Sequence, residues 1–179
     1  MATNNNRIDI IVEDDSWAQV AVVSEGQCAA VFEAICDFLR HNNIKVRYGL
    51  LDVGRPLGAV LVLSNAEQVR QLNAEFRKKD KPTNVLSFAN IDAGDFIQTM
   101  QSDEVIGLGD IIMAREVLVD EAKQLKISTE HHFIHLLVHG LLHLLGFDHQ
   151  NDDEAEVMEG IEIAVLKEMN IDNPYKEFE

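Results

Sequence analysis

The sequence contains few cysteines and few prolines. Only two of its 179 residues are Cys, Cys28 and Cys36, and only three are Pro. Two thiols in a chain of this size fit buried side chains in a reducing compartment better than a disulfide framework or a metal clip. The low cysteine content therefore argues against a small secreted domain that is held together by disulfides.

Long apolar runs are also missing. No segment approaches the run of about 18 apolar residues that a membrane-spanning helix needs. The polar start Met-Ala-Thr-Asn-Asn-Asn lacks the basic and apolar regions of a signal peptide. We therefore expect a cytoplasmic protein with no membrane partner.

Basic residues are scarce. The chain has 15 Lys and Arg against 31 Asp and Glu, which gives a net charge of −16. Taken alone, this balance argues against nucleic acid, DNA included, because phosphate binding depends on cationic contacts. Four of the basic residues nevertheless lie within five positions, at Arg77, Lys78, Lys79 and Lys81. Such a run is either a solvated turn or, beside a catalytic site, a phosphate clamp.

The organisation of the chain predicts an α+β fold. No repeat, low-complexity segment or linker divides residues 1–179, so we expect a single domain. Strands are expected at residues 8–12, 45–51, 57–63, 84–88 and 105–113. Helices are expected at 24–40, at 115–125 and at 152–169, with two more that begin at Ser64 or Asn65 and run through Phe76, and at Ser128 or Thr129 and run to Gly146. The acidic segment between 88 and 105 is expected to be a loop near a cleft. A mixed sheet of about four strands packed by about five helices follows.

Six of the seven histidines lie between His131 and His149. His139 and His143 are four residues apart, so they project from one face of a helix about one turn apart. Gly146 can end that helix in the left-handed conformation and return His149 as a third ligand. Three nitrogen ligands that leave one position open to water are typical of catalytic zinc, and we predict one Zn²⁺ per chain. The alternative is a histidine-rich amphipathic helix whose rings are satisfied in a core.

The remaining polar residues of this region have open roles. His135 lies one turn before His139 and could support the site or line the cleft. Asp148 could fix the ring of His149 through a hydrogen bond or could cap the helix end. The roles of His131 and His132 are left open.

Residues 139–149, HGLLHLLGFDH, resemble two known metal motifs. The metzincin protease signature, H-E-x-x-H-x-x-G-x-x-H, has its general-base Glu where this chain has Gly140. The signature H-G-x-L-H-L-x-G-[YF]-D-H of the YbeY family of endoribonucleases is reproduced at every fixed position. Residues 76–88, FRKKDKPTNVLSF, and 107–111, GLGDI, also resemble segments of that family, although Ala89 stands where the family usually has Pro.

The resemblance implies a metal-dependent, single-strand-specific endoribonuclease with a zincin-like His helix. It further implies a role in 16S rRNA 3′-end maturation and ribosome quality control, with ribosomal RNA and the small subunit as partners. Arg77 is the expected catalytic residue beside His139, His143 and His149, because a guanidinium pairs with phosphate in a fork. The alternatives are a hydrolase of another bond, with a metzincin-like peptidase as the leading case, and a non-catalytic ribosome-associated metalloprotein.

Overall fold

The computed structural model describes residues 5–20 and 24–176. Residues 1–4, which belong to the polar start that lacks the features of a signal peptide, lie outside these ranges. Four strands form one sheet in the order β1-β2-β4-β3. The strands are β1 (Arg7–Val12), β2 (Leu57–Ser64), β3 (Val85–Ala89) and β4 (Ile106–Ala114). β1, β2 and β4 are parallel, whereas β3 runs antiparallel to β4 and forms one edge of the sheet. The predicted mixed sheet of four strands is therefore confirmed.

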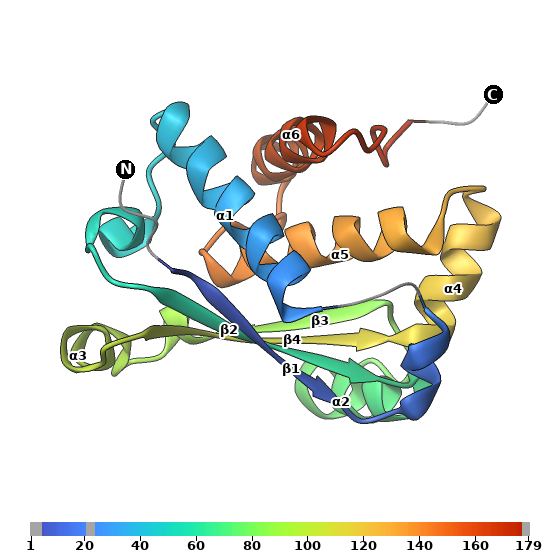
Figure 1. Ribbon diagram of the computed structural model, residues 1–179. Helices are drawn as coiled ribbons and strands as arrows, with labels where there is room; N and C mark the ends of the chain where they lie inside the picture. Colours follow the sequence, from blue (N-terminus) through green and yellow to red (C-terminus); the bar gives the residue numbers. More distant parts are fainter. Residues whose placement is uncertain (1–4, 21–23, 177–179) are drawn as a thin grey trace.

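Helices cover both faces of this sheet. The α-helices of the described residues are α1 (Glu25–His41), α2 (Ala66–Arg77), α3 (Phe96–Ser102), α4 (Arg115–Gln124), α5 (Thr129–Leu144) and α6 (Asp152–Glu168). α1 and α5 pack on one face, α6 lies outside α5, and α2 covers the other face beneath β3 and β4 (Figure 1). The α5 helix, which carries the histidines, thus lies in the middle layer.

The main hydrophobic core lies between α1, α5, α6 and the sheet. Leu137, Leu141 and Leu144 of α5 are completely buried in it, and so are Leu61 of β2 and Ile111 of β4. Burying each of these leucines contributes at most about 1.5–3 kcal/mol. That contribution fixes α5 against the sheet and gives its histidines a rigid base.

Gly109 allows β3 to approach β4 closely. A β-bulge shifts the register between β2 and β4 beside it, and Gly109 adopts φ +128°. A Cβ atom at this position would lie 2.0 Å from the backbone oxygen of Phe88. Only glycine fits, because both the left-handed conformation and the short distance exclude a side chain.

Two predictions about secondary structure were wrong. Residues 45–51 do not form a strand: a 3₁₀ segment, η2 (Arg47–Asp52), occupies this region, with Tyr48 at φ 55° and Gly49 at φ 62°. These left-handed residues turn the chain so that Leu50 becomes fully buried. The segment after β3 is not a plain loop, because it contains a short 3₁₀ turn, η3 (Asn90–Asp92), and α3, whose Phe96 is buried.

The two cysteines behave as predicted from their number and spacing. Cys28 and Cys36 are buried and free, and burial raises their pKa values to about 11 and about 12. Both thiols are therefore protonated at neutral pH. No helix among residues 5–20 and 24–176 is long and apolar enough to span a membrane.

The packing of α5 on β4 predicts opposite effects for two glycine-to-alanine substitutions. A Cβ atom at Gly140 would lie 3.0 Å from the buried side chain of Ile111, whereas nothing lies within 4 Å of one at Gly160 in α6. Overpacking costs about 1–3 kcal/mol, and alanine gains about 0.5–1 kcal/mol over glycine in a helix. Urea denaturation should therefore show that Gly140→Ala lowers the free energy of unfolding and that Gly160→Ala raises it. Stabilisation by both substitutions would contradict this packing.

Candidate metal centre

Local interactions at both ends of α5 hold the histidines in place. The hydroxyl of Ser128 caps the helix and accepts a hydrogen bond from the backbone N–H of His131 at 3.0 Å. At the other end Gly146 adopts φ +95°, and its N–H donates to the carbonyl of His143. The N–H of Phe147 donates to the carbonyl of Leu142, which completes a Schellman motif. The predicted stop at Gly146 is confirmed, and it directs the chain back toward the helix.

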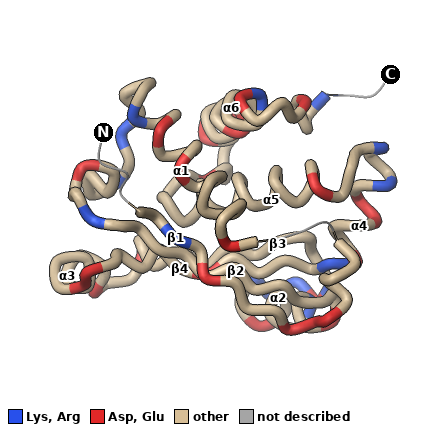
Figure 2. The backbone as a smooth tube through the Cα atoms, viewed as in Figure 1, with Lys and Arg blue, Asp and Glu red and all other residues tan. Residues whose placement is uncertain are grey.

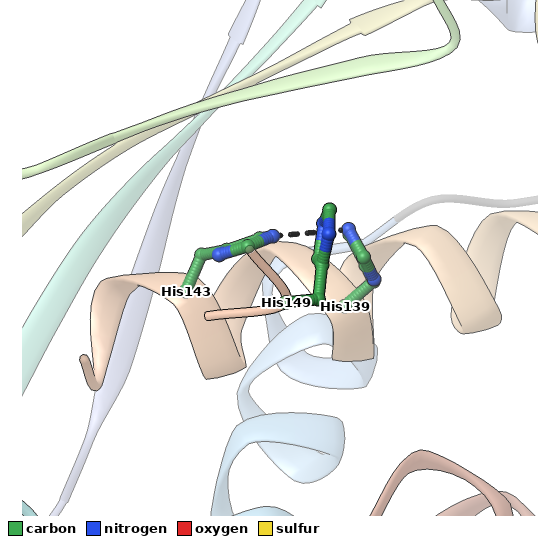
Figure 3. A group of neighbouring side chains, drawn as sticks. All are labelled: His139, His143 and His149. Atoms are coloured by element: carbon green, nitrogen blue, oxygen red, sulfur yellow. Dashed lines mark hydrogen bonds between the residues drawn. The ribbon is translucent and has the colours of Figure 1, made fainter. Parts of the chain in front are cut away.

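The three predicted ligands converge. His139 and His143 project from α5 with their rings turned toward each other, and His149 from the following segment joins them (Figure 3). One nitrogen from each ring lies within 4.8 Å of the others, and the Nε2 atoms of His139 and His143 are 3.1 Å apart. Nitrogen ligands of a tetrahedral zinc ion are separated by about 3.3–3.4 Å. The spacing thus fits a small divalent cation.

The hydrogen bonds of two of these rings leave their Nε2 atoms free for a metal. His139 Nδ1 donates to a carboxylate oxygen of Glu162 at 2.8 Å, and His143 Nδ1 donates to the carbonyl of Phe147 at 3.0 Å. Both partners are acceptors, so Nδ1 must hold the proton in each ring. The two Nε2 lone pairs of neutral rings would then face each other, an arrangement that a cation between them stabilises. The donor set therefore fits a metal.

Glu162 is the centre of a buried polar network. Its side chain has no exposed surface and also accepts hydrogen bonds from His135 Nε2 at 3.0 Å and from the Tyr175 hydroxyl at 2.5 Å. Burial raises the pKa of Glu162, but the hydrogen bonds from His135 and His139 outweigh this effect and hold the pKa at about 2. Glu162 is therefore ionised, and it fixes the orientation of the His139 ring.

His143 is held in its neutral form. Burial and the neighbouring imidazoles of His139 and His149 lower the pKa of His143 to about 4. A neutral ring is required for coordination, because the protonated ring has no lone pair on Nε2. The surroundings of His143 thus keep its ring in the neutral form that can bind a metal.

A cleft of about 730 Å³ opens beside His143 and His149. Arg77, the last residue of α2, lines it, whereas Lys78, Lys79 and Lys81 do not. No hydrogen bond or ion pair of the described residues involves the Arg77 guanidinium. Arg70, on the same helix, pairs instead with the carboxylates of Glu67 and Asp80. The structure thus brings one free guanidinium of the basic run to the histidines.

The remaining predicted residues have other contacts. His135 donates a hydrogen bond to Glu162 and so supports the site, which is one of the two roles expected for it. His132 is buried and bonds to Glu121 of α4 at 2.7 Å, away from the three ligands. Asp148 takes neither expected role, because its carboxylate accepts from the backbone N–H of His149 and from the side chain of Gln150.

Sequence reasoning missed two residues of the site, Glu162 and Arg47. Glu162 looked like one more acid on an amphipathic helix, although it sits among the apolar neighbours Ile161 and Ile163 in the sequence. That apolar context is the signal that could have identified a buried carboxylate. Arg47 lines the cleft but lies in the segment that was predicted to be a strand.

Comparisons with known proteins identify the family of this chain. Residues 14–170 match the family described as "Endoribonuclease YbeY". A protein of that name from Azorhizobium caulinodans is 39% identical over 170 residues, which cover 94% of this chain and 95% of the relative. The protein of the same name from Rhizobium etli is 40% identical over 171 residues, with coverage of 94% and 92%. A relative from Acinetobacter baumannii is 49% identical over 112 residues, which cover 62% of this chain and 69% of its own.

A solved structure shares the fold. The solution structure of TM1509 from Thermotoga maritima has a TM-score of 0.50 and 17% identity, with 95% of this chain and 96% of that chain covered. At this identity the likeness concerns the fold alone. The family match over most of the sequence, and relatives matched over nearly their whole length, show that this chain belongs to the endoribonuclease YbeY family.

Proposed function

We propose that this chain is a single-domain, zinc-dependent endoribonuclease that cleaves single-stranded RNA in 16S rRNA 3′-end maturation and ribosome quality control. The observation that carries the proposal is the convergence of His139, His143 and His149 beside a cleft that also holds the free guanidinium of Arg77. Relatives bearing the name endoribonuclease support the RNA substrate. This role would place the chain in the cytoplasm with the small subunit and its RNA as partners.

His139, His143 and His149 are the residues that would hold the metal. Three neutral imidazoles favour zinc over magnesium or calcium, which prefer oxygen ligands. A zinc ion held in this way supplies Lewis acidity and makes water a usable nucleophile at neutral pH. Glu162 and the carbonyl of Phe147 keep the two rings on α5 in the required tautomer and orientation.

Arg77 would stabilise the charge that develops during cleavage. Attack on a phosphodiester places additional negative charge on the non-bridging oxygens, and a planar guanidinium can donate two parallel hydrogen bonds to them. Arg77 is free of internal partners in the described part of the chain, so it loses no ion pair when it binds a phosphate. Removing one donor of this kind typically costs about 10²–10³-fold in rate.

The peptidase alternative is disfavoured by the packing at Gly140. A peptidase of the metzincin type needs a Glu at this position as its general base. This chain has no carboxylate there, and even a Cβ atom would approach the side chain of Ile111 to 3.0 Å, so a longer side chain would require Ile111 to shift. The close contact between α5 and β4 therefore favours glycine over the peptidase's Glu at this position.

The first prediction concerns the metal. Purified protein should contain about one zinc per chain, and the triple variant His139→Ala/His143→Ala/His149→Ala should lose it while remaining folded by circular dichroism. His131→Ala is the matched control, because this exposed residue of the same helix should not affect the metal content. Glu162→Gln should weaken zinc binding by about 10–100-fold, measured by competition with a chelator. Full retention of zinc in the triple variant would refute the ligand assignment.

The second prediction tests the reaction. The zinc-loaded protein should cut single-stranded RNA and leave casein intact, and His143→Ala should cut neither. The expectation follows from the open position that three nitrogen ligands leave for chemistry. Gel electrophoresis of an end-labelled RNA gives the readout. Casein cleavage without RNA cleavage would favour the peptidase, and binding to small subunits without any cleavage would favour a non-catalytic role.

The third prediction separates Arg77 from the neighbouring lysines. Arg77→Glu should lower the cleavage rate by at least about 10²–10³-fold without changing the zinc content. Replacing Lys78, Lys79 or Lys81 by Gln should only weaken RNA binding and reduce its salt dependence by at most about one unit of slope per lysine. The physical reason is that the lysines lie outside the cleft lining. A near wild-type rate for Arg77→Glu would show that the basic run is a solvated turn.

A further inference from the structure

A second arginine lines the cleft. Arg47 comes from η2, a segment remote in sequence from the basic run of residues 77–81, and it borders the same cavity as Arg77, His143 and His149. Acidic residues are spread through the layers of the molecule, on α2 beneath the sheet as well as on α6 above it (Figure 2). The net charge is −16, with 15 basic residues against 31 acidic ones, yet two arginines line this one cleft.

Three contacts hold Arg47 in place. Its aliphatic stem packs against Gly146, where a Cβ atom would lie 3.0 Å from Cδ of Arg47. Its guanidinium carbon lies 5.4 Å from the ring centroid of Tyr48, and its Nη1 donates to a carboxylate oxygen of Asp92 at 2.5 Å. Gly146, at which the histidine helix ends, is thus also the residue that the Arg47 side chain contacts.

The backbone beside Arg47 is strained. Tyr48 and Gly49 follow it with two successive left-handed conformations, at φ 55° and φ 62°. A residue with a bulky side chain rarely adopts this conformation, and strain of this kind tends to be retained where function requires it. Here the strained turn lies directly beside a guanidinium that lines the cleft.

The ion pair between Arg47 and Asp92 is exposed. The two side chains retain 47% and 70% of their accessible surface. Exposed ion pairs are weak and are screened by salt, so a phosphate that enters the cleft can replace the carboxylate. Arg77 has no carboxylate partner among the described residues and therefore needs no such exchange.

We propose that Arg47 binds a second backbone phosphate of the RNA strand, beside the one that Arg77 contacts. The Asp92 carboxylate occupies the position of this phosphate until RNA enters. The inference rests on the proposed function and adds a residue that sets substrate affinity rather than rate. The Asp92 carboxylate neutralises Arg47 in the free protein. RNA that occupies the cleft releases this pair and gains the guanidinium as a ligand.

Steady-state cleavage of a single-stranded RNA at a series of KCl concentrations tests this role in the zinc-loaded protein. Arg47→Gln should raise KM about fivefold, leave kcat within about twofold, and reduce the log–log salt slope by about 0.7. Asp92→Asn should do the opposite and lower KM about two- to threefold, because it frees Arg47 and removes a negative charge. In the Arg47→Gln background, Asp92→Asn should change log KM by less than half of its change in the wild-type background, since the two groups are coupled.

Arg40→Gln provides the matched control. Arg40 lies on α1, forms an ion pair with Asp37, and does not line the cleft, so its loss changes the net charge equally without touching the site. This variant should show the KM and salt slope of the wild type.

Two results would overturn the inference. One is a wild-type KM and salt slope for Arg47→Gln. The other is a rise in KM for Asp92→Asn that matches the effect of Arg47→Gln, which would mean that the pair only holds η2 and η3 together. If the wild type cuts no RNA, the proposed function fails by itself. Fluorescence anisotropy with labelled RNA then compares the same variants for binding.

Discussion

The burial of α5 between the sheet and α6 is the constraint on which the site depends. Leu137, Leu141 and Leu144 anchor the inner face of the helix in the core. Gly140 lets the helix backbone lie directly against Ile111 of β4. This packing fixes the rotation of α5 about its axis, so its half-buried histidines His139 and His143 keep a constant direction toward the cleft. The same packing that stabilises the domain therefore also organises the candidate metal centre.

The buried charge of Glu162 links the C-terminal part of the chain to that centre. A carboxylate without exposed surface is costly unless hydrogen bonds compensate it. Glu162 has three donors, from His135, His139 and Tyr175. Because two lie on α5 and one follows α6, the network joins these segments at the site. The position of α6 and the orientation of the His139 ring are therefore linked through Glu162.

Positive charge is scarce in this molecule. With 31 acidic residues against 15 basic ones, the overall field repels a polyanion. Under the proposed function, attraction for RNA would come from guanidinium groups at the cleft, where Arg77 is free and Arg47 pairs with Asp92. Such a distribution would suppress non-specific binding and concentrate RNA affinity next to the histidines. An acidic protein can thus still present a local surface for phosphate.

The sequence by itself determined the parts of the site that depend on local geometry. The spacing of His139 and His143 and the stop at Gly146 follow from the helical period and from glycine's freedom at positive φ. Tertiary structure alone decided that Glu162, 23 residues beyond His139, reaches its ring and that Asp92 meets Arg47 across 45 residues. Periodicity fixes which face a residue occupies on its own element. The angle and distance between elements are set by packing in the whole core, and that is where long-range polar contacts arise.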